Sequence, residues 1–194
     1  RVYRAKAHEL PETNRAARGQ HVANLLAFQP DEQIASVMDI KDYSVSPYLV
    51  LATKRGLVKK TKLSDFDSNR SGGIVAINLR EDDELIAARL VAPTDDLLLV
   101  SRNAQSIRFH ADDDMLRPMG RATSGVIGMR FSEGDELLAM EVATDDELDI
   151  LIATDGGYAK RTKVGEYPVQ GRGGKGVITA KIVVKRGGLV GALA

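Results

Sequence analysis

A pattern of residues recurs along this chain about every 51 residues, and this internal repeat limits the possible folds more than any other feature. An apolar segment at 48–53 recurs at 96–101 and at 149–154. After a turn, each copy leads into a short segment with cations, at 59–62, 107–110 and 160–163. The apolar residue before the last strand-like segment of each unit recurs at Ile34, Leu85, Leu137 and Leu189. Four units at this period indicate a repeat architecture.

The units are built from strand-like segments. Residues 74–79 are typical of them, since they are short, rich in β-branched residues and bounded by glycine or an acidic turn. No stretch keeps a 3.6-residue apolar period over the roughly 10 residues that a helix needs. About four strands per unit predict an all-β, propeller-like repeat. We expect one repeat domain over 1–194, cut from a longer subunit, with blades at about 1–47, 48–95, 96–148 and 149–194.

The charge is balanced overall but unevenly placed. The chain holds 27 basic and 27 acidic side chains, yet residues 101–150 carry a net charge of −6 and residues 151–194 a net charge of +6. A locally basic end can attract a polyanion although the total charge is zero. Cysteine is absent, which excludes disulfides and thiolate chemistry and fits a cytoplasmic protein. No apolar run approaches the roughly 18 residues of a membrane span, so we expect no membrane partner.

The basic end contains a glycine-rich loop, which consists of Gln170, Gly171, Arg172, Gly173, Gly174, Lys175 and Gly176. Glycines let a phosphate chain approach the backbone, and successive N–H groups in such a loop can form an anion-binding concavity. An arginine can bind a phosphate through two parallel hydrogen bonds, and a lysine adds a mobile point charge. Such contacts position a nucleic-acid backbone without reading its bases.

The 170–176 loop resembles the seven-residue signature box of the DNA gyrase A subunit, which reads Gln, basic, Arg, Gly, Gly, Lys or Arg, Gly. Six of the seven positions match, and Gly171 is the departure, because the family has a cation there. The resemblance extends to the segment 2–19, which looks like the opening of a later blade of that protein's C-terminal domain. It also extends to the strands at 52–62 and 153–163, where Ala-Thr, a glycine and a Lys-Lys-Thr or Lys-Arg-Thr segment follow one another as in that domain's blades. The 170–176 loop is then an additional copy of a box that the family places in its first blade.

The resemblance implies a β-pinwheel, in which strands are exchanged between neighbouring blades, as a fragment of roughly four blades. It also implies that the domain binds and bends double-stranded DNA around a basic rim, so that an ATP-dependent type IIA topoisomerase introduces negative supercoils. The partners implied are the remainder of the A subunit, together with the gyrase B subunit, in a heterotetramer. ATP and Mg²⁺ would belong to that complex, and no cofactor or catalytic residue is expected in this fragment.

Other cations follow the same repeat and are further candidates for DNA contacts. The loops of the first three units offer Arg15, Arg18, Arg70 and Arg121. The basic strands add Lys59, Lys60, Arg108, Lys160 and Arg161. For the strand cations, an alternative is that they guard a sheet edge against aggregation.

Two other functions stay open. The equivalent domain of topoisomerase IV lacks a strong box, so the intact stretch 172–176 argues against it. A protein-interaction propeller explains the repeats and the balanced charge but not the box. The scattered His8, His21 and His110 lack the spacing of metal ligands, and no nucleophile elbow occurs, so we expect no metal site and no independent enzyme.

Overall fold

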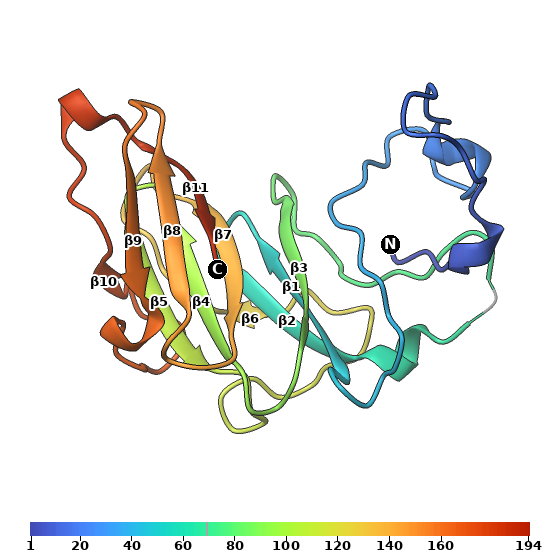
Figure 1. The fold of residues 1–194 in the computed structure, drawn as a ribbon. Coiled ribbons are helices and arrows are strands. Elements are labelled where there is room, and N and C mark those ends of the chain that lie inside the picture. The colour runs from blue at the N-terminus through green and yellow to red at the C-terminus, as the bar shows by residue number, and fades with distance from the viewer. Residues whose placement is uncertain (69) are drawn as a thin grey trace.

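The computed structural model describes residues 1–68 and 70–194, which form antiparallel strands joined by loops and short 3₁₀ turns (Figure 1). The strands are β1 (Tyr48–Thr53), β2 (Leu57–Lys62), β3 (Leu85–Val91), β4 (Asp96–Ser101), β5 (Gln105–His110), β6 (Val126–Ile127), β7 (Leu137–Ala143), β8 (Asp149–Thr154), β9 (Ala159–Lys163), β10 (Val177–Ile178) and β11 (Leu189–Leu193). The 3₁₀ turns are η1 (Ala7–Glu9), η2 (Val22–Asn24), η3 (Leu63–Phe66), η4 (Val164–Glu166) and η5 (Val184–Arg186). The predicted all-β fold is confirmed. Among these described residues, no helix has the length and apolarity needed to cross a membrane.

The first and second sheets are each completed by a strand from the unit that follows in the chain. The first sheet has the strand order β3-β1-β2-β6, and the second has the order β10-β5-β4-β7. Within the second unit, β1, β2 and β3 are consecutive, but β6 comes from the third unit, where Val126 pairs with Val58. In the same way β10 comes from the fourth unit, where Val177 pairs with Ser106 of β5. The strand exchange that the resemblance implies is therefore present.

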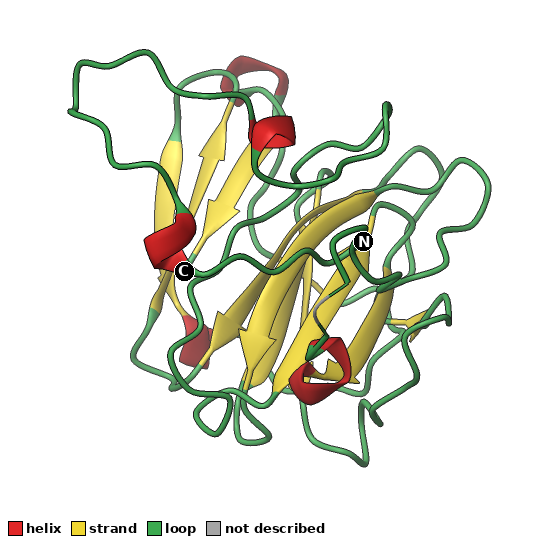
Figure 2. Cartoon of the chain, turned by 90° about the vertical axis from the view of Figure 1, so that its right-hand side faces the viewer, coloured by secondary structure: helices red, strands yellow, loops and turns green. Residues whose placement is uncertain are grey.

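The two ends of the chain depart from the expected four-stranded blades. Residues 1–47 form η1, η2 and loops, which lie in front of the sheets in Figure 2, and Val2 makes an isolated bridge with Ile74. A sheet starts from a hairpin such as β1–β2, and residues 1–47 contain no such hairpin among them. Ile74 is the repeat equivalent of Val126. Val2 forms an isolated bridge with Ile74, which corresponds to the pairing of Val58 with Val126 in the first sheet. The third sheet, β11-β8-β9, has three strands. The expected blade ranges stay a prediction.

The cores lie between successive sheets. Because side chains alternate along a strand, one strand can serve two cores. Leu97 and Leu99 of β4 are buried against the first sheet, in a cluster with Val50 and Val58. Leu98 of the same strand is buried against the third sheet. This explains why the apolar segments of the repeat are nearly continuous rather than alternating.

The sheets have an inner and an outer edge. Strand β7 contacts both β3 and β11, so these three edge strands converge. The exchanged strands β6 and β10 lie at the opposite edges of their sheets. The loops that lead into β6 and β10 are therefore at the outer edge, where the sheets diverge.

A glycine with positive φ precedes each exchanged strand. Gly125 (φ 89°) comes before β6, and a Cβ there would lie 2.6 Å from the carbonyl oxygen of Val58. Gly176 (φ 76°) comes before β10, and a Cβ there would overlap the carbonyl of Ser106 and lie 3.0 Å from the nitrogen of Ile107. Only glycine permits both the backbone conformation and this close approach to the preceding sheet.

Lys59 of the predicted basic strands is buried, not free. Its side chain is fully inaccessible, and Nζ donates to the carbonyl oxygens of Ala76, at 2.6 Å, and of Arg121. Burial lowers the pKa of this ammonium from 10.5 to about 8. Since Arg121 lies in the third unit, Lys59 joins two units. This burial and these two hydrogen bonds argue against a phosphate contact, and the role of Lys59 as a DNA contact stays a prediction.

Lys60 and Arg108 occupy equivalent positions in β2 and β5 and also join successive units. Nζ of Lys60 donates to the carbonyl of Ala111 at 2.6 Å and to Asp113 at 2.8 Å, while the buried Arg108 donates to the carbonyl of Val164 at 3.1 Å. Arg108 also pairs with Asp96 and Asp146, each at 2.6 Å. The same argument applies to these two buried cations, whose role as DNA contacts stays a prediction. We call Lys59, Lys60 and Arg108 the inter-unit struts.

Replacing Gly176 by Ala should lower the free energy of unfolding by about 2–4 kcal/mol, because a Cβ strains the backbone and displaces β10 from β5. Gly171→Ala is the matched control from the same loop. A Cβ at Gly171 meets no atom within 4 Å, so its effect should stay within about 0.5 kcal/mol. Urea unfolding of both variants measures the difference, and equal stabilities would contradict the role given to Gly176.

Replacing Lys59 by Met should lower stability by about 1–3 kcal/mol at pH 7, since two inter-unit carbonyls lose their donor. Lys160→Met, at the equivalent but exposed position of β9, should change it by less than about 0.5 kcal/mol. Between pH 8 and 10.5 the unfolded chain binds more protons at Lys59 than the folded chain does. Stability from this group therefore rises with pH. The wild-type advantage over Lys59→Met should grow across that window in thermal unfolding, and a shrinking advantage would refute the lowered pKa.

Candidate nucleic-acid interface

The 170–176 loop is fixed on the third unit although it contains four glycines. The N–H of Gln170 donates to the carbonyl of Arg108 at 2.8 Å, and the N–H of Gly173 donates to the carbonyl of Gly128 at 2.6 Å. In the other direction, the N–H of Arg130 donates to the carbonyl of Gly174 at 2.9 Å. Three backbone bonds thus hold the loop at the outer edge of the second sheet, beside β10.

The loop at 119–125 docks on the second unit through equivalent bonds. The N–H of Met119 donates to the carbonyl of Lys60 at 2.8 Å, as Gln170 does to Arg108. The N–H of Asn78 donates to the carbonyl of Thr123 at 3.0 Å, as Arg130 does to Gly174. The two loops therefore occupy equivalent places on successive sheets, and Arg121 and Arg172 are equivalent positions within them.

The cations of the 170–176 loop face solvent. Both Arg172 and Lys175 are exposed. Nε and one terminal nitrogen of Arg172 donate to the carbonyls of Met115, at 2.7 Å, and Ile127, at 3.0 Å. Nζ of Lys175 lies 3.4 Å from Oγ of Ser132. Across residues 1–68 and 70–194, neither cation forms a salt bridge, so their charge is not cancelled by a neighbouring carboxylate.

The remaining loop arginines are also exposed, but the structure anchors them differently. Arg121 lies in the docked 119–125 loop, and its carbonyl oxygen accepts a hydrogen bond from Nζ of Lys59. Arg70 lies in the loop before Ile74, which the Val2 bridge holds. Arg15 and Arg18 lie in the first unit, and no sheet precedes that unit in this chain for their loop to dock on. The structure thus brings Arg121 and Arg172 into register and leaves Arg15 and Arg18 apart from that pattern.

Lys160 and Arg161 differ from their repeat equivalents Lys59 and Lys60. Both side chains are exposed on β9, which lies at the edge of the third sheet. Nζ of Lys160 lies 3.3 Å from the carbonyl of Thr179, which is the counterpart of the Ala76 carbonyl at Lys59. Nε of Arg161 lies 3.5 Å from Asp149. Their role as DNA contacts stays a prediction.

Two residues that the sequence analysis did not single out support the loops. Arg130 donates from its guanidinium to the carbonyl of Gly173 at 2.7 Å, and the amide of Asn78 donates to the carbonyl of Ala122 at 3.0 Å. They stand at equivalent positions of the repeat, 52 residues apart. A signal for them existed, since Arg130 follows Val126 of β6 by four residues and Asn78 follows Ile74, the equivalent position in the second unit, by the same number.

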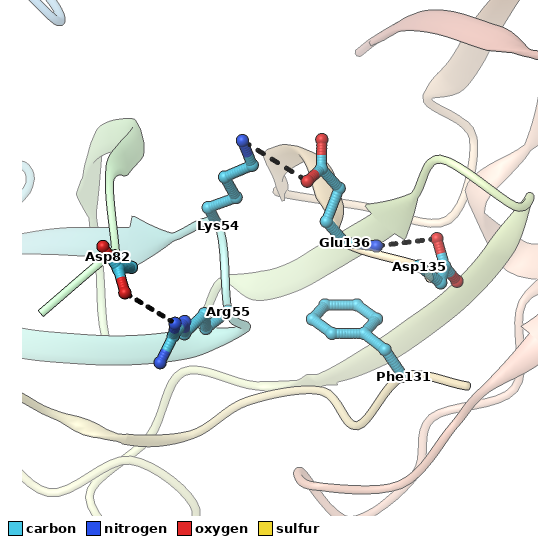
Figure 3. Close-up of a pocket in the computed structure, with 6 residues that line it drawn as sticks. All are labelled: Lys54, Arg55, Asp82, Phe131, Asp135 and Glu136. Carbon is cyan, nitrogen blue, oxygen red and sulfur yellow. Dashed lines mark hydrogen bonds and ion pairs between the residues drawn. The ribbon is translucent and has the colours of Figure 1, made fainter. Parts of the chain in front are cut away.

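A surface cavity of about 280 Å³ near the β1–β2 turn is a poor alternative site for a polyanion (Figure 3). Its cations are matched by carboxylates, since Lys54 lies 3.4 Å from Glu136 and Arg55 lies 4.0 Å from Asp82. Within the described part of the chain, no cluster of His, Asp and Glu has an arrangement that could hold a metal ion.

Comparison with known proteins gives the family. The family described as DNA gyrase C-terminal domain, beta-propeller, matches residues 1–41, 47–92, 95–144 and 148–194. The chain is 70% identical over 193 residues to the DNA gyrase A subunit of Mycolicibacterium smegmatis and 69% identical over 198 residues to that of Streptomyces coelicolor. Each match covers 100% of the chain and 23% of the relative, so the chain spans less than a quarter of their length.

Solved structures agree with this assignment. A C-terminal domain of DNA topoisomerase IV superposes with a TM-score of 0.83 at 29% identity, covering 96% of the chain and 58% of that domain. A DNA gyrase A C-terminal domain superposes with a TM-score of 0.79 at 25% identity, covering 98% of the chain and 60% of that domain. Since the family match extends over most of the residues, the chain belongs to the DNA gyrase C-terminal domain family of β-propellers.

Proposed function

We propose that this chain binds duplex DNA along its outer edge and wraps it, as part of a DNA gyrase A subunit. The observation that carries the proposal is the equivalent docking of the 119–125 and 170–176 loops. That docking sets an exposed arginine at the outer edge of two successive sheets, and the 170–176 loop adds Lys175. Cations repeated at blade intervals match a curved row of phosphates better than a compact ligand.

Wrapping requires that these contacts offset the cost of bending the DNA. Bending a duplex site by about 40–90° costs about 1–6 kcal/mol by elastic estimates. Each phosphate that a cation neutralises releases counterions, so several spaced contacts can supply that free energy without reading bases. The binding is then weakly dependent on base sequence and falls steeply as salt rises.

In the whole enzyme, wrapping would present the DNA segment to the cleavage core with a crossing of fixed chirality, so that ATP-driven strand passage introduces negative supercoils. DNA cleavage, ATP and Mg²⁺ would belong to the rest of the A subunit, or to the B subunit, in a cytoplasmic heterotetramer. This chain would contribute no catalytic residue and no cofactor. The identities of 69–70% to gyrase A subunits support gyrase over topoisomerase IV.

A linking-number experiment tests the proposal. Relaxed circular DNA bound to the chain is treated with a relaxing enzyme, and a wrapping protein should leave a linking-number change of constant sign. The Arg172→Ala, Lys175→Ala double variant should reduce that change more than Arg121→Ala, because it removes the loop with two cations. No change with the wild type would favour a protein-interaction propeller. Equal reductions would show that the 170–176 loop does not dominate.

Restoring the missing cation of the box should strengthen DNA binding. A Cβ at Gly171 would meet no atom within 4 Å, and φ of Gly171 is not positive, so a side chain can begin there without backbone strain. Gly171→Lys should therefore raise the affinity for duplex DNA and steepen the slope of log K against log salt by about 0.9. Gly171→Ala controls for the backbone change. An unchanged slope for Gly171→Lys would place this position outside the DNA contact.

A further inference from the structure

Arg172 is exposed, but two of its donor groups are already used by the protein. Nε donates to the carbonyl of Met115 and a terminal nitrogen donates to the carbonyl of Ile127, both in the third unit. A guanidinium presents its donors in a rigid planar fork, so one arginine can fix two carbonyls at once. The side chain therefore connects its own loop to the neighbouring unit, on which that loop docks.

The repeat shows why the loop needs this connection. In the first sheet, the ammonium of Lys59 holds the 119–125 loop by its Arg121 carbonyl. In the second sheet, Ile107 stands at the position of Lys59, since it pairs with Leu99 as Lys59 pairs with Leu51. Its Cδ1 would lie 3.4 Å from a Cβ at Gly174, directly beneath the loop, and it has no donor to offer. The side chain of Arg172 supplies the inter-unit bond that no lysine supplies there.

Other groups of the loop are left for a ligand. Lys175 is exposed, with the 3.4 Å approach to Ser132 as its weak polar contact. Within residues 1–68 and 70–194, the backbone N–H groups of Gly174 and Lys175 donate to no protein acceptor. Neighbouring N–H groups beside a lysine are an anion-binding arrangement.

We infer that Arg172 is a positioning residue and that Lys175, with the N–H groups of Gly174 and Lys175, contacts the DNA phosphate. The inference rests on the proposed function. It gives the two cations of the loop different roles: the arginine fixes the shape of a glycine-rich segment, and the lysine provides the charge. Without the arginine, the four glycines would give the loop many conformations, and ordering them would weaken binding.

Charge-conserving substitutions separate the two roles. Arg172→Lys keeps the charge but cannot span two carbonyls, so it should weaken binding to a fluorescent duplex about tenfold, the loss of one to two hydrogen bonds. Lys175→Arg keeps the charge of a phosphate contact and should retain affinity within about twofold. If Arg172→Lys binds as well as the wild type, the positioning role is overturned.

Hydrogen exchange of the free chain tests the same role without DNA. The N–H of Gly173, which is bonded to Gly128, should exchange faster in Arg172→Lys than in the wild type, and at the wild-type rate in Lys175→Arg. Amides of β4 report on the global fold and should stay protected. Loss of protection throughout the chain, or unchanged exchange at Gly173, would contradict the local positioning role of Arg172. If the wild type itself binds no DNA, the proposed function fails while the exchange result still decides the role of Arg172.

Discussion

Exchange of one strand between successive units is the constraint on which the rest of this structure depends. Strands β6 and β10 close sheets that begin in the preceding unit, so neither the first nor the second sheet is complete without its successor. The exchange also carries the loop in front of each strand across the unit boundary. As a result, the 119–125 and 170–176 loops rest on the sheet before them, in equivalent places.

Beside the apolar cores between the sheets, buried cations also form contacts between the units. Lys59 and Lys60 donate to carbonyls of the third unit, and Arg108 donates to a carbonyl of the fourth. A buried charge without hydrogen-bond partners is costly, so each of these groups is stable only while the following unit is in place. The inter-unit struts therefore make the packing of one unit depend on the next.

The same architecture separates structural cations from those available to a polyanion. In β2 and β5 the cations in the middle of the strand are covered by the next unit, whereas Arg121 and Lys175 in the docked loops stay exposed at the outer edge. Arg172 is exposed as well, but it donates to two carbonyls of the neighbouring unit. The proposed contact of this edge with DNA rests on family membership and on the regular placement of the loops. Among the described residues, no carboxylate of the acidic third unit forms a salt bridge with Arg172 or Lys175, and its Asp113 is paired with Lys60 instead.

Much of this protein could be predicted from its sequence, because the repeat, the strand-like segments and the glycine-rich loop are local patterns. The all-β fold, the family and the exposure of Arg172 and Lys175 follow from those patterns. The roles of the strand cations do not. Lys59 and Lys160 stand in nearly the same local sequence, yet one is fully buried and the other is exposed. Only the tertiary structure decides between them, because burial depends on whether a following unit brings its loop and its carbonyls over the side chain.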